Sequence, residues 1–159
     1  MALIVEDGTG LATAESYVSV SDADAYHVSF GNTDWAGYST EQKEIALRRA
    51  TVYIDSNYMF AGEKYRISQR LEWPRYNYSE NEVWPEVNIV QACCELALRA
   101  VEANLLTDTE DQVVLREVIG PLRTDYAYKN PEVRFPAVDR LLQKFTFSGG
   151  SSVRIGLTG

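Results

Sequence analysis

The chain has 159 residues, a length that suits one domain with its own hydrophobic core. Hydrophobic residues make up 45% and charged residues 24%, as in an ordinary folded protein, and no apolar run is long enough to span a bilayer. The formal net charge of −8 has the wrong sign for a protein whose main task is to neutralise phosphates.

Residues 1–20 predict an extended, turn-rich arm. The arm lacks the basic and apolar regions of a signal peptide, so we expect a cytosolic chain. Residues 16–20 alternate polar and apolar side chains, which predicts a short strand. Ser21 is a candidate N-cap, and it predicts a first helix from about Asp22 to Phe30.

A loop carrying Trp35 is expected to precede a second helix. Ser39 or Thr40 caps this helix, which should end near Asn57. Arg48, Arg49, Asp55 and Glu44 are expected to face outward or sideways. The side chains at helical spacing that should face the core are Leu47, Ala50, Ile54 and Tyr58.

Residues 60–85 form a long, aromatic-rich connection, and connections of this length are usually functional or packed on themselves. Within it, Leu71-Glu72-Trp73-Pro74-Arg75 is the most informative stretch. Pro74 restricts the backbone around a large aromatic ring, so the pentapeptide predicts a rigid anchor. Trp73 either fills the protein's own core or meets a partner. Glu72, Trp73 and Arg75 are therefore the candidate residues for a subunit interface.

The segment from about Glu86 to Asn104 predicts the central helix. Its polar residues follow a single stripe, and the rest of its circumference is apolar. Cys93 and Cys94 lie in the apolar part. Neighbouring helical positions point in different directions, so we interpret them as two small buried hydrophobic residues and not as a disulfide.

Residues 113–128 predict a β-hairpin with Gly120-Pro121 at its turn. Pro136 opens a last helix that should run to about Lys144. Residues 148–159 predict a flexible C-terminal arm, which is either disordered or adds an edge strand to a partner. The candidate partner-binding residues in this arm are Val153, Arg154, Ile155 and Leu157.

The chain offers little that points to catalysis. The carboxylates of Glu6, Asp7, Asp22 and Asp24 lie near turns and helix starts, where they usually serve as caps. His27 has no matching nucleophile pattern and is expected to be a half-exposed structural residue. Metal-ligand spacings and nucleotide-binding glycine motifs are absent. We therefore expect a protein without catalytic activity, metal or cofactor.

A nucleic-acid interpretation has support in residues 60–85. Aromatic residues alternate there with basic residues, a pattern that suits the stacking of single-stranded bases. Several glutamates in the same region weaken this pattern. Single-strand binding would predict a steep dependence of affinity on salt. The basic residues concerned are Lys64, Arg66, Arg70 and Arg75.

The elements together predict a mainly α fold. About four helices form a bundle over residues 1–147, with a small β-hairpin and extended N- and C-terminal arms. Three sequence features in this order resemble a family of tailed-bacteriophage proteins that carries a DnaT-like single-stranded-DNA-binding label. They are the N-terminal run from Val5 to Tyr26, the segment from Ala46 to Asp55, and the pentapeptide.

The order of helices and hairpin is also similar to head–tail connector (adaptor) proteins. That resemblance implies a structural protein of the virion, made in the host cytoplasm and located at the head–tail junction. It would form a ring, a dodecamer by analogy, with the portal protein and a downstream tail or neck protein as partners. Genome DNA would pass through the ring without specific binding, and no membrane would be involved. The alternative is a DnaT-like single-stranded-DNA-binding accessory protein of replication.

Overall fold

The computed structural model describes residues 2–76, 86–103, 105, 116–119, 122–125 and 135–146. The described part is mainly helical, which confirms the predicted fold class. Its helices are α1 (Val20–Ser29), α2 (Thr33–Ala36), α3 (Thr40–Asn57), α4 (Val87–Glu102) and α5 (Pro136–Leu142), and the 3-10 helix η1 (Gln143–Phe145) follows α5.

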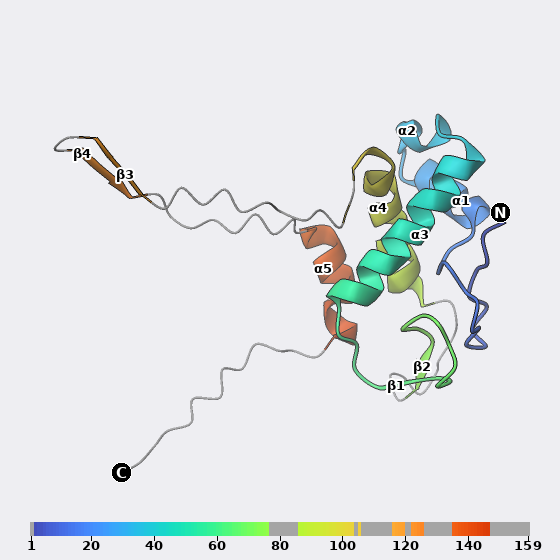
Figure 1. Cartoon of the computed structure of the whole chain (residues 1–159). Helices are drawn as coiled ribbons and strands as arrows, with labels where there is room; N and C mark the ends of the chain where they lie inside the picture. The colour runs from blue at the N-terminus through green and yellow to red at the C-terminus, as the bar shows by residue number, and fades with distance from the viewer. Residues whose placement is uncertain are drawn as a thin grey trace, which may run out of the picture.

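Helices α3 and α4 form the centre of the molecule (Figure 1). The predicted start of α3 is confirmed, because the Ser39 hydroxyl accepts a hydrogen bond from Gln42 N while the Gln42 side chain accepts one from Ser39 N. On α4, small buried residues such as Ala97 and Ala100 let the two helices approach closely. Cys93 and Cys94 are buried and free, as predicted.

Helices α1 and α2 cover one end of the α3–α4 pair (Figure 1). Helix α1 begins before the predicted position, because Ser19 and not Ser21 is its N-cap and accepts a hydrogen bond from Asp22 N. The predicted strand at residues 16–20 is wrong. Ser16 makes only an isolated parallel bridge with Val5, and helix α1 already begins at Val20. The loop expected around Trp35 contains the short helix α2.

Two small antiparallel ribbons complete the described fold. Strand β1 (Glu63–Lys64) pairs with β2 (Arg75–Tyr76), inside the segment expected to lack secondary structure. Strand β3 (Arg116–Ile119) pairs with β4 (Leu122–Asp125), which confirms the hairpin predicted at residues 113–128. Its predicted turn at Gly120-Pro121 lies outside the described residues.

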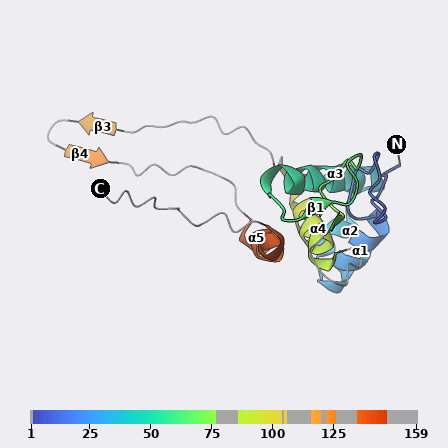
Figure 2. The same cartoon turned by 90° about the horizontal axis from the view of Figure 1, so that it is seen from below.

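Helix α5 lies beside the α3–α4 pair, as Figures 1 and 2 both show, and it contacts α4. It starts at Pro136 as predicted, and η1 completes the segment expected to reach about Lys144. Phe60 and Thr146 form an antiparallel bridge, and Ala61 N donates to Phe145 O at 2.9 Å. These backbone hydrogen bonds join the segment that follows α3 to the end of η1.

Candidate functional site

Residues 60–76 form a loop that we call the lobe; it lies at the end of the α3–α4 pair opposite α2 (Figure 1). Strands β1 and β2 fold the lobe back on itself, with Glu63 opposite Tyr76 and Lys64 opposite Arg75. Gly62 has a positive φ of 78°, and a Cβ at this position would lie 2.4 Å from the carbonyl oxygen of Tyr76. Only glycine permits this close approach of the two backbone segments.

The side chain of Arg75 holds the lobe together from within. Its guanidinium donates to the carbonyl oxygens of Phe60, Ala61 and Gly62 at 3.2, 2.8 and 2.6 Å. It also donates to a carboxylate oxygen of Glu72 at 2.7 Å. The other carboxylate oxygen of Glu72 lies 2.9 Å from Lys64 Nζ. Two of the lobe's four basic side chains are therefore engaged inside the lobe.

A buried glutamine organises the turn before the pentapeptide. The Gln69 amide nitrogen donates to the carbonyl oxygens of Leu71 and Pro74 at 2.8 and 3.0 Å. Its amide oxygen accepts a hydrogen bond from Arg66 N at 2.9 Å. Because the amide has partners on both sides, Gln69 fixes the path of the chain between Arg66 and Pro74 without a helix or strand.

The N-terminal arm supports the lobe from outside. The Glu6 carboxylate accepts hydrogen bonds from Gly8 N, Gly10 N and Leu11 N at 2.9, 2.8 and 2.9 Å. The loop that it holds meets the lobe, since Leu11 O accepts a hydrogen bond from Arg70 N at 3.1 Å. Glu6 therefore serves as a loop cap, in agreement with the interpretation of the turn carboxylates.

The pentapeptide lies at the base of the lobe. Trp73 is 4% exposed, and its ring lies 5.7 Å from that of Phe60 and 5.1 Å from that of Phe145. Trp73 N donates to the Tyr17 hydroxyl at 3.3 Å, and that hydroxyl donates in turn to the Asp55 carboxylate. Trp73 is thus part of the protein's own core, the first of the two roles left open by the sequence.

Asp55 joins α3 to the lobe and does not simply face outward as expected. Its second carboxylate oxygen accepts a hydrogen bond from Glu72 N at 3.2 Å. Burial raises the pKa of Asp55 to about 6, although the hydrogen bonds from Tyr17 and Glu72 N act in the opposite direction. Burial also raises the pKa of the Tyr17 hydroxyl, which stays protonated.

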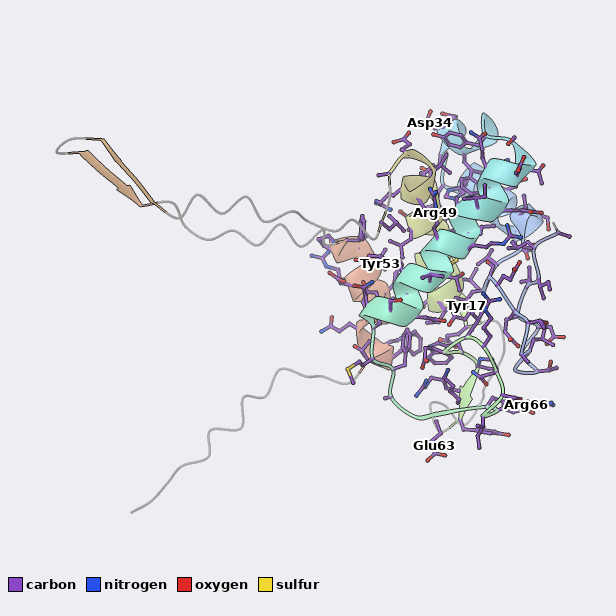
Figure 3. All side chains as sticks on the ribbon, in the orientation of Figure 1. Tyr17, Asp34, Arg49, Tyr53, Glu63 and Arg66 are labelled. Atoms are coloured by element: carbon purple, nitrogen blue, oxygen red, sulfur yellow. The ribbon has the colours of Figure 1, made fainter. Side chains whose placement is uncertain are left out.

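The outer surface of the lobe carries two neighbouring tyrosines and two exposed arginines. The rings of Tyr65 and Tyr76 lie 4.7 Å apart at an angle of 41°, and Tyr76 is 44% exposed. The guanidinium of Arg66 lies 5.8 Å from the Tyr65 ring centroid, and Arg70 is exposed nearby in the chain. We call Tyr65, Arg66 and Tyr76 the tyrosine face; Arg70 is a second exposed cation of the lobe, on the side of the N-terminal arm. Figure 3 shows Arg66 at the outer side of the lobe, away from α3.

The lobe brings together the predicted interface residues Glu72, Trp73 and Arg75. The contacts of Glu72 and Arg75 described above are all made within the same chain. Their contact with another copy stays a prediction. The predicted partner-binding residues Val153, Arg154, Ile155 and Leu157 lie outside the described residues, as does the whole arm at 148–159.

The remaining candidate residues, at the start of α1 and in the core, make contacts that stabilise the fold. The hydroxyl group of Ser19 bonds to the Asp22 carboxylate, and Asp24 accepts from the indole nitrogen of Trp35. His27 is buried rather than half-exposed, with its ring 4.5 Å from that of Trp35, and burial lowers its pKa. Within the described residues there is no His, Cys, Asp and Glu cluster suited to a metal ion, and no described helix could cross a membrane.

The sequence pattern indicated the aromatic and basic residues of the lobe. It did not show that Lys64 and Arg75 pair with Glu72 while Arg66 and Arg70 stay exposed. It did not identify Gln69, Glu6 or Tyr17 as the residues that position the lobe. Gln69 follows a turn-forming serine, and Glu6 precedes a Gly-Thr-Gly run, so a weak signal for loop caps was present. The pairing of Tyr65 with Tyr76 has no local signal, because eleven positions separate them.

The fold and the lobe define a class: a helical protein that presents an aromatic and basic loop surface. The sequence model of the family described as "Putative DnaT-like ssDNA binding protein" matches residues 1–157. The chain belongs to this family. Comparison with curated proteins gives no match, and neither does comparison with solved structures.

The family corrects the predicted function. The interpretation as a head–tail connector is wrong, since the match supports the DnaT-like alternative. The portal and neck partners, the dodecameric ring and the passage of DNA without specific binding are set aside with it. The charge argument against DNA binding used the net charge of the chain and the glutamates of the whole aromatic-rich connection, whereas the lobe at residues 60–76 has four basic and two acidic side chains. The location in the virion and the absence of catalysis stay predictions.

Proposed function

We propose that this protein binds single-stranded DNA and that the tyrosine face is its contact surface. The observation that carries the proposal is the pair of neighbouring rings, Tyr65 and Tyr76, with Arg66 beside them, on a lobe that also exposes Arg70. The description of the family supports the same class of ligand.

Stacking would supply most of the affinity. An unpaired base has a flat π surface that can lie on an exposed aromatic ring, and such a contact is worth about 1–3 kcal/mol per base. Duplex DNA keeps its bases stacked on one another and cannot offer them in this way. A surface of neighbouring tyrosines therefore favours single strands.

The arginines would hold the sugar–phosphate backbone beside the stacked bases. Lys64 and Arg75 contribute less to this attraction, because Glu72 lies against both of them. Arg66 and Arg70 are exposed, and their backbone amides are fixed by Gln69 and by Leu11. The lobe thus offers two exposed cations, on a backbone held in place, in an otherwise acidic protein.

The test is the binding of a fluorescent oligonucleotide of about twelve nucleotides, measured by anisotropy at low salt. Tyr76→Ala should weaken binding about tenfold or more, because one stacking surface is lost. Tyr38→Ala is the matched control, since Tyr38 is a half-buried tyrosine whose hydroxyl bonds to Glu102 at the C-terminal end of α4. Arg66→Gln and Arg70→Gln should each weaken binding, whereas Arg140→Gln on α5 should not.

Failure of the wild-type protein to bind the oligonucleotide would overturn the proposal. Equal losses in Tyr76→Ala and Tyr38→Ala would overturn the assignment of the surface. Circular dichroism of each variant shows whether the helical fold is intact.

A further inference from the structure

The tyrosine face has a carboxylate beside it. Glu63 is directly opposite Tyr76 in the β1–β2 pair, and opposite residues of an antiparallel pair project their side chains to the same side. Tyr65 follows Glu63 by two positions, and its ring lies against that of Tyr76. Figure 3 shows Glu63 at the bottom of the lobe, at its outer side, and Arg66 at the right-hand side of the lobe. A base stacked on Tyr76 would therefore have the Glu63 carboxylate close to its edge.

Glu63 has no structural task in the described part of the chain. It is exposed, and no hydrogen bond or ion pair joins its side chain to another described residue. The carboxylate of the other acidic residue of the lobe, Glu72, is engaged by Lys64 and Arg75. A free carboxylate beside a surface for DNA repels phosphates, so general attraction does not explain its position.

We propose that Glu63 recognises the edge of the stacked base and selects guanine. This inference deepens the proposed single-strand binding and depends on it. An ionised carboxylate only accepts hydrogen bonds, and its two oxygens can accept two parallel bonds from adjacent donors. Single-stranded bases expose their Watson–Crick edges, and proteins read these edges by hydrogen bonding.

Guanine alone among the four DNA bases has two adjacent donors on that edge, the ring N1–H and the exocyclic N2 amino group. Cytosine and adenine have one amino group next to a ring nitrogen that accepts. Thymine has one N–H between two carbonyl oxygens, which repel a carboxylate. The chemistry of Glu63 therefore matches guanine best and thymine worst.

The test compares three oligonucleotides of about twelve nucleotides in the same anisotropy assay. The first has guanine at every third position among thymines, the second has hypoxanthine at the same positions, and the third is thymine only. Hypoxanthine lacks the N2 amino group but stacks similarly, and the thymine spacing prevents quadruplex formation. The wild-type protein should bind the guanine oligonucleotide about fivefold to tenfold more tightly than the hypoxanthine one, because one charge-assisted hydrogen bond is lost.

Glu63→Gln should bring the guanine-to-hypoxanthine affinity ratio close to one. Glu41→Gln removes the same charge from an exposed position in the first turn of α3 and should leave the ratio unchanged. The ratio is the deciding quantity, because the loss of a negative charge strengthens binding to every oligonucleotide.

The two proposals fail in different ways. Absence of wild-type binding to all three oligonucleotides overturns single-strand binding itself. Binding with equal affinity for guanine and hypoxanthine overturns only the inference about Glu63, as does a guanine preference that persists in Glu63→Gln.

Discussion

Asp55 shows how a single residue connects the helical core with the lobe. Its carboxylate accepts hydrogen bonds from Tyr17 on the N-terminal arm and from the backbone of Glu72. Trp73 joins the same network through its backbone amide. Three segments that are distant in sequence are thereby fixed at one point. The sequence predicted the anchoring role of Trp73, but it placed Asp55 with the outward and sideways residues of its helix, because a carboxylate without visible partners is usually solvated.

The buried Asp55 should make stability depend on pH in a defined direction. Its pKa is 3.8 in an ordinary environment and about 6 in the folded protein, so the folded state binds more protons between these two values. The contribution of Asp55 to the free energy of unfolding is therefore largest below pH 4. It should decrease by about 3 kcal/mol as the pH rises through 6.

Chemical denaturation of the wild type and of Asp55→Asn at pH 4, 5, 6 and 7 measures this contribution. The stability difference between the two proteins should change across this range, since asparagine does not titrate. Parallel pH profiles would contradict the prediction.

Trp73→Ala should destabilise the folded chain by about 3–5 kcal/mol, because the substitution leaves a large cavity between Phe60 and Phe145. Urea denaturation followed by circular dichroism measures the loss. A variant that keeps wild-type stability but fails to self-associate would instead move Trp73 to a subunit interface. Tyr76→Ala, at an exposed ring of the same lobe, is the control for a general effect of aromatic truncation.

At the scale of elements, local signals predicted the central helices better than the segments at their ends. Helices α3 and α4 were predicted within a few residues, since their capping residues and apolar spacing lie in the elements themselves. The strand expected at residues 16–20 failed because alternation over five residues is also compatible with an irregular chain that leads into an N-cap. The short strands β1 and β2 gave no signal, because contacts of Arg75 and Gln69 organise them.

The N-terminal loop should control the position of the lobe through Glu6. Glu6→Ala leaves three backbone donors without their acceptor and should lower stability by about 1–3 kcal/mol. It should also weaken oligonucleotide binding, since the loop touches the backbone of Arg70. Asp7→Ala is the matched control for stability, because Asp7 accepts hydrogen bonds only from Thr9 at an exposed position. Thermal melting and anisotropy measure the two effects, and equal melting temperatures of the two variants would refute the role of Glu6.

For the whole molecule, the distribution of charge matters more than its sum. The net charge of −8 favoured a protein that repels DNA, yet the lobe is locally basic. Because only some of its cations are exposed, the expected dependence of DNA affinity on salt also changes. Lys64 and Arg75 are engaged by Glu72, which leaves Arg66 and Arg70 as the exposed cations of the lobe.

The affinity for single-stranded DNA should therefore fall only gradually with salt. Two phosphate contacts predict a slope of about −1.4 in a plot of log K against log salt concentration, and Arg66→Gln should reduce its magnitude to about 0.7. Anisotropy titrations between low and physiological salt measure both slopes. A steep wild-type slope would show that cations other than Arg66 and Arg70 carry much of the binding.

The sequence by itself determined the helical class, the main helices, the hairpin and the family motifs, because each depends on residues close together in the chain. It also identified the pentapeptide as an anchor. Only the tertiary structure decided which object Trp73 packs against, which cations of the lobe stay exposed, and that Tyr65 and Tyr76 form one surface with Glu63 beside it. Those properties depend on contacts between residues distant in sequence, and composition does not reveal them.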